Sequence, residues 1–85
     1  MPEISRFEGM IIQMYYDDHP DPHIHVKHAA KRAKIDLDGN LVAGELPLPK
    51  LHIVKRWIIL HKEELLKNWK RMRKGIKPRK IEPWV

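Results

Sequence analysis

Two prolines, Pro47 and Pro49, divide this chain of 85 residues into halves with different hydrophobic periodicities. Before them, apolar residues alternate with polar ones, as in residues 33–37, which is the two-residue period of a half-buried strand. After them, apolar residues recur every three or four positions, which is the period of an amphipathic helix. Proline removes a backbone donor from a sheet but is tolerated in the first turn of a helix. The sequence therefore predicts an α+β fold in which a sheet is followed by a helix.

The first half contains short segments rich in β-branched, aromatic or alternating apolar residues, which are typical of strands. The segment Asp38-Gly39-Asn40 is a strong hairpin signal, because glycine and asparagine tolerate the positive φ of tight turns. Short strands joined by short connections predict an antiparallel meander. We expect about five strands within residues 3–46, at 4–7, 10–16, 24–29, 31–37 and 41–46.

The second half predicts one long helix, from about residue 50 to residue 74, packed on the sheet. Gly75 and Pro78 supply the signals that end it. With a rise of 1.5 Å per residue, the helix would be roughly 37 Å long, more than a five-stranded sheet covers. We therefore expect a kink between Ile58 and His61. The apolar stripe consists of Leu51, Val54, Ile58, His61, Leu65, Trp69 and Met72.

The length of the chain allows one domain with a modest core. We expect a β-meander at 1–48, a helix at 49–75 and a basic tail at 76–85. The chain has no cysteine, which suits a reducing cytosol and excludes a disulfide framework. It shows no signal peptide and no apolar segment of membrane-spanning length, so we expect a cytoplasmic protein without a membrane partner.

The positive charge of the chain is concentrated in its second half. Residues 1–49 hold 5 Lys or Arg against 8 Asp or Glu, giving −3, whereas residues 50–85 hold 12 against 3, giving +9. Such asymmetry favours a nucleic acid or an acidic protein surface as a partner, although a solvated helix face has the same composition. The candidate contact residues are Lys62, Lys67, Lys70, Arg73, Lys74, Arg79 and Lys80.

The first part of the predicted helix is apolar nearly all round, from Leu51 to Leu60. A helix of this kind on a small protein indicates burial from two sides, hence a homodimer or a protein partner.

A cluster of potential ligands lies at His19-Pro20-Asp21-Pro22-His23-Ile24-His25-Val26. The prolines favour extended or turn geometry, and a strand follows Pro22. Because side chains alternate along a strand, His23 and His25 share one face and Ile24 and Val26 the other. We expect the apolar pair to face the core and both histidines to lie on the open side.

Neutral imidazole is a common ligand for divalent metals, so the cluster predicts a metal site formed by His19, His23, His25 and Asp18. Two alternatives stay open. The histidines either contact a phosphate or a partner chain, or fill polar positions of a proline-held turn without binding anything. If the helix crosses the histidine-bearing face, His52 or His61 could complete the site.

Four segments together resemble a widespread family of short bacterial proteins classed as a domain of unknown function. They are residues 2–7, 14–19, 22–26 and 65–69, and the tyrosine, aspartate and histidine block at 15–19 is the most specific. The family usually has proline at Asp21 and an aromatic residue at Ile24. The resemblance covers nearly the whole chain and implies no established activity. It implies a prokaryotic cytosolic protein that is often encoded beside a second small protein, as in toxin–antitoxin or regulatory pairs.

Two function classes follow from these observations. The first is an interaction module that acts with a protein partner and binds nucleic acid through the basic helix. The second is a metal-dependent nuclease or hydrolase that uses the His23 and His25 cluster. A purely structural role, as a subunit of a larger complex, stays open beside them.

Overall fold

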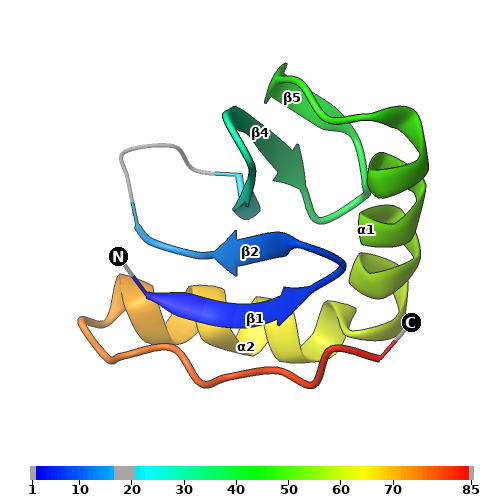
Figure 1. The fold of residues 1–85 in the computed structure, drawn as a ribbon. Coiled ribbons are helices and arrows are strands. Elements are labelled where there is room, and N and C mark those ends of the chain that lie inside the picture. Colours follow the sequence, from blue (N-terminus) through cyan, green and yellow to red (C-terminus); the bar gives the residue numbers. More distant parts are fainter. Residues whose placement is uncertain (1, 17–20, 85) are drawn as a thin grey trace.

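The computed structural model describes residues 2–16 and 21–84 as a five-stranded sheet followed by two helices. The strands are neighbours in chain order and every pair is antiparallel, so the sheet is a simple meander. This confirms the predicted fold class (Figure 1). The strands are β1 (Glu3–Phe7), β2 (Met10–Gln13), β3 (His23–His28), β4 (Lys31–Asp36) and β5 (Leu41–Gly44).

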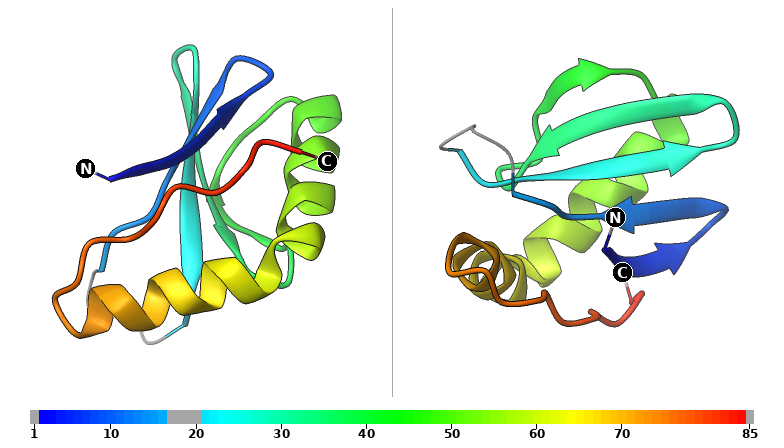
Figure 2. Two further views of the ribbon diagram at one scale, coloured as in Figure 1. Left: turned by 90° about the horizontal axis from the view of Figure 1, so that it is seen from below. Right: turned by 90° about the vertical axis from the view of Figure 1, so that its left-hand side faces the viewer.

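Two helices replace the single long helix, and they meet where the kink was predicted. Helix α1 spans Leu48–Leu60 and helix α2 spans Lys62–Arg73. The backbone at His61, with φ −112° and ψ 20°, departs from helical geometry and turns the chain. The two helices therefore form an L that packs against one face of the sheet (Figure 2). In the part of the chain that the structure describes, no helix is long and apolar enough to cross a membrane.

The core lies between the sheet and this L. Alternate residues of the central strands, including Ile24 and Val26, are fully buried, as the two-residue period predicts. They pack against Trp57 of α1 and Leu65 of α2, which are also fully buried. Burial of one such side chain contributes about 1.5–3 kcal/mol. The core of this small protein therefore requires both helices.

The tail that follows α2 turns back and runs beside β1 (Figures 1 and 2). The backbone N–H of Ile81 donates to the carbonyl of Ile4 at 2.7 Å, and the Ile81 side chain is buried. The indole N–H of Trp57 donates to the carbonyl of Glu82 at 2.9 Å. The segment predicted as a basic tail is thus a structured cover over the outer edge of the sheet.

Gly44 at the end of β5 occupies a position that no other residue fits. Its φ is +81°, and a Cβ there would clash with the carbonyl oxygen of Arg32 and approach Cα of Ala33 to 2.9 Å. Gly75 has a similar φ of +75° but open space around it. Both glycines thus have a φ that would strain any residue with a Cβ, and at Gly44 alone that Cβ would also clash with the neighbouring strand.

We expect Gly75→Ala to destabilise the protein by about 1–2 kcal/mol, the cost of a left-handed alanine. Gly44→Ala should cost about 1–3 kcal/mol more, because overpacking adds to that strain. Urea unfolding followed by circular dichroism measures both. Equal losses in the two variants would show that the close approach of β4 to β5 is not a constraint.

Candidate functional site

The two histidines of β3 lie side by side but in different environments. Their ring centroids are 5.1 Å apart. His23 is only 2% exposed, because Trp69 of α2 lies against its ring at 5.0 Å. His25 is half-buried and stacks on Tyr15, with ring centroids 4.3 Å apart and planes 13° apart. The prediction that both histidines lie on the open side was therefore wrong for His23.

Hydrogen bonding orients the ring of His23. Its Nδ1 lies 2.8 Å from the carbonyl oxygen of Asp21, which can only accept, so Nδ1 carries the proton and donates. Asp36 pairs with His23 across the strands, but its carboxylate accepts the backbone N–H groups of Asp38 and Asn40. The carboxylate of Asp36 therefore stabilises the turn after β4 through these hydrogen bonds.

The other two predicted metal ligands, Asp18 and His19, are not among the residues that the structure describes. Within residues 2–16 and 21–84, no three His, Asp or Glu side chains form a group that could hold a metal. His61 instead contacts Glu64 through Nδ1 at 3.2 Å and the carbonyl of Trp84 through Nε2 at 3.0 Å, and His52 is exposed. Neither helix histidine completes the site.

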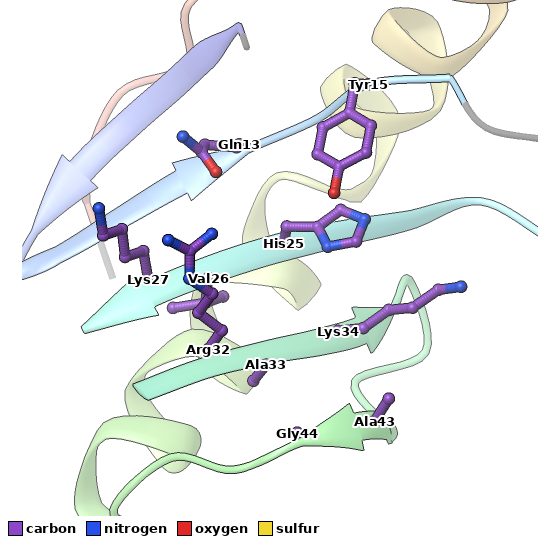
Figure 3. A pocket seen from close by; sticks show the side chains of 10 residues that line it. All are labelled: Gln13, Tyr15, His25, Val26, Lys27, Arg32, Ala33, Lys34, Ala43 and Gly44. Carbon is purple, nitrogen blue, oxygen red and sulfur yellow. The ribbon is translucent and has the colours of Figure 1, made fainter. Parts of the chain in front are cut away.

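The open face of the sheet contains a shallow hollow of about 270 Å³ beside His25. Lys27 lies directly opposite Arg32 on the neighbouring strand, and His25 lies opposite Lys34. Strand alternation in the sequence already placed Lys27 on the face of His25, and Arg32 and Lys34 together on one face of β4, but sequence reasoning did not name these cations as contact residues. Figure 3 shows the lining side chains, which are those of Gln13, Tyr15, His25, Val26, Lys27, Arg32, Ala33, Lys34 and Ala43, together with Gly44.

A second cationic region follows the outer side of α2. Surface hollows there are lined by Lys67, Lys70, Arg71 and Lys74, and by Lys70 with Arg73 and Lys74. Sequence reasoning named most of these residues but missed Arg71, whose spacing from Lys67 and Lys74 places it on the same helix face.

Lys62 stands apart from this region, because its Nζ lies 3.0 Å from the carboxylate of Asp38. The carboxylate already compensates the charge of Lys62. Of the predicted contact residues, Lys62 is therefore the weakest candidate for binding an anionic partner.

Asn68 attaches the tail to α2. This asparagine is 1% exposed, and its amide donates to the carbonyl of Arg79 at 2.8 Å and accepts the N–H of Arg79 at 2.9 Å. The same amide oxygen accepts a bond from the guanidinium of Arg71 at 2.9 Å. Arg79 and Lys80 consequently line a common hollow with Lys67 and Arg71. We call Lys67, Lys70, Arg71, Lys74, Arg79 and Lys80 the α2–tail surface.

One exposed ion pair marks the beginning of β1. The guanidinium of Arg6 donates to the carboxylate of Glu3 at 2.7 and 3.2 Å. These hydrogen bonds lower the pKa of Glu3 and raise that of Arg6. The charge of Arg6 is therefore compensated locally, whereas none of the described carboxylates forms a salt bridge with the sheet-face cations Lys27, Arg32 and Lys34.

The fold and these surfaces define a small α+β protein with two separate cationic regions. Residues 9–70 match the family described as Domain of unknown function (DUF4160). This match covers most of the chain, which therefore belongs to that family. No curated protein and no solved structure matches the chain significantly.

Replacing Asn68 by alanine should release the tail and leave the backbone N–H and carbonyl of Arg79 without their partner. Each of these two hydrogen bonds contributes about 0.5–1.5 kcal/mol net, so we expect a loss of stability of about 1–3 kcal/mol. Urea unfolding measures it. Lys70→Ala on the exposed side of the same helix is the control and should stay within about 0.5 kcal/mol of the wild type. A loss no greater than that of the control would show that Asn68 does not hold the tail.

Proposed function

We propose that this protein is a small interaction module that binds the phosphate backbone of nucleic acid through the α2–tail surface. The observation that carries the proposal is the attachment of Arg79 to Asn68, which adds two tail cations to those of the helix. A row of cations from two segments fits the repeating charge of a phosphate backbone better than an isolated lysine does.

The electrostatics of this surface support the proposal. Lys67, Lys70 and Lys74 are exposed, and no described carboxylate forms a salt bridge with them. Glu64 lines one of the hollows, but its carboxylate is turned toward His61. Phosphate binding by such uncompensated cations releases condensed counterions, which is the main driving force for nonspecific nucleic-acid binding.

The module acts with a protein partner in the cytoplasm of a prokaryote, as one component of a two-gene system of the toxin–antitoxin or regulatory kind. The family motif supports this assignment, and so does the outward side of α1. Ile59 and Leu60 are 72% and 61% exposed there, which is costly for large apolar side chains on an isolated protein. Sedimentation of the purified chain tests whether the partner is a second copy of this chain. A stable homodimer that buries Ile59 and Leu60 would show that the partner is a second copy and not a different protein.

We expect Lys70→Ala/Lys74→Ala to weaken binding to duplex and single-stranded nucleic acid alike. Each lost phosphate contact should reduce the steepness of the log–log salt dependence by about one. Fluorescence anisotropy with labelled oligonucleotides at several salt concentrations measures both effects.

The matched control is Lys31→Ala/Arg56→Ala, which removes two exposed cations outside the α2–tail surface. An equal loss of affinity in the control would show that the effect comes from net charge and not from the α2–tail surface. Absence of wild-type binding at low salt would leave only the protein-partner role.

The alternative function, a metal-dependent nuclease or hydrolase, is supported by one observation on His23. Histidines that bind metal commonly donate their other ring N–H to a carbonyl, which fixes the ring. His23 makes such a bond to Asp21, and the ring of His25 lies 5.1 Å away. In this proposal His23 and His25 bind a divalent metal together with His19 and Asp18.

If the metal proposal holds, added zinc or manganese should raise the melting temperature of the wild type. Ligand at a hundredfold excess over Kd stabilises by about 2.7 kcal/mol. His25→Ala should abolish this shift, whereas His52→Ala on the exposed side of α1 should retain it. Metal analysis of the purified protein gives an independent readout. No metal and no thermal shift in the wild type would reject the metal site.

A further inference from the structure

The hollow on the open face of the sheet has the chemistry of a second ligand site. Its polar side chains come from three adjacent strands and the segment after β2, and they lie on the side opposite the helices (Figure 3). We define the sheet-face site as Gln13, Tyr15, His25, Lys27, Arg32 and Lys34. We propose that this site binds an unpaired nucleotide of single-stranded nucleic acid.

The arrangement of the cations points to an anionic ligand. Lys27 and Arg32 are both exposed and stand directly opposite each other on antiparallel strands. Like charges in this position destabilise a sheet. Lys34 adds a third cation in the next cross-strand row, and none of the described residues that line the hollow is a carboxylate. A bound phosphate would convert this repulsion into three favourable contacts.

The neighbouring aromatic pair points to a base attached to that phosphate. Tyr15 and His25 stack nearly in parallel, and both residues line the hollow beside the cations. Proteins that bind single strands use aromatic rings on which unpaired bases stack, next to cations that track the backbone. The amide of Gln13 and the hydroxyl of Tyr15 can donate to or accept from the polar edge of a base.

The size and shape of the hollow favour a segment of a polymer over a free small molecule. Its volume of about 270 Å³ lies below the range of roughly 300–1,000 Å³ that is typical of small-molecule sites. It is also an open surface hollow and not an enclosed cavity. A paired base is already stacked within its duplex, so the site should discriminate in favour of single strands.

This inference rests on the proposed nucleic-acid function for the class of ligand, but it uses none of the residues of the α2–tail surface. The two can therefore be separated by experiment. The probes are labelled oligouridylate and oligothymidylate, with a duplex of the same length, and fluorescence anisotropy reports binding. Comparison of the two single strands distinguishes RNA from DNA as the source of the ligand.

Arg32→Ala is the principal variant, and Arg56→Ala is its matched control, because both remove one exposed arginine. Arg32→Ala should weaken single-strand binding and leave duplex binding unchanged, whereas Arg56→Ala should affect neither selectively. Tyr15→Leu should weaken single-strand binding by about 5- to 150-fold, the range for loss of one stacked base. Tyr15→Phe keeps the ring and should bind within a few-fold of the wild type. Circular dichroism confirms that the variants fold.

Equal single-strand binding by Arg32→Ala and Arg56→Ala would overturn the inference, and so would equal losses for single strands and duplex in Arg32→Ala. If only Lys70→Ala/Lys74→Ala weakens binding, the proposed function stands and the sheet-face site fails. If the wild type binds single strands through Arg32 and Tyr15 but does not bind duplex, the α2–tail surface fails and the sheet-face site stands. Binding of a phosphoserine peptide without binding of either oligonucleotide would reject a nucleotide as the ligand.

Discussion

The packing of Trp57 joins the separate parts of this protein. Its side chain is fully buried, and its ring contacts Phe7 of β1 at 5.3 Å and His61 at the helix junction at 5.4 Å. Its indole N–H also bonds to the carbonyl of Glu82 in the tail. One residue thus links the sheet edge, the bend between the helices and the returning tail. A large aromatic ring with one polar group suits this position, because its apolar surface fills the core while its indole N–H bonds to the tail carbonyl.

Local patterns predicted most of the fold. The alternation through Ala33 and Ile35 predicted a strand with one buried face, and both side chains are buried. The glycine of the Asp38-Gly39-Asn40 turn has the expected positive φ of +88°. The length argument for a kink also led to the correct region, since the helices separate at His61. These features depend on neighbours in the sequence, which explains why the sequence alone reveals them.

The features that sequence reasoning missed depend on contacts between distant residues. His23 is buried because Trp69, from a helix far along the chain, covers its ring. The tail is structured because Asn68 bonds to the backbone of Arg79, and no periodicity marks a single buried asparagine. Sequence reasoning did not name Lys27, Arg32 and Lys34 as contact residues, because the net charge of their half of the chain is −3. Among its acidic residues, Glu3 is paired with Arg6 and Asp36 serves a turn, so the net charge does not describe the local surface.

The unequal edges of the sheet limit how this chain could associate through its strands. The β1 edge is covered by the tail, with Ile81 bonded to Ile4, whereas β5 forms the opposite edge and all four of its residues are exposed. Continued edge-to-edge growth requires two open edges on every copy. A copy that pairs through β5 would present only covered edges to the next one. Strand pairing through β5 would therefore end at two chains, because the tail already occupies the other edge.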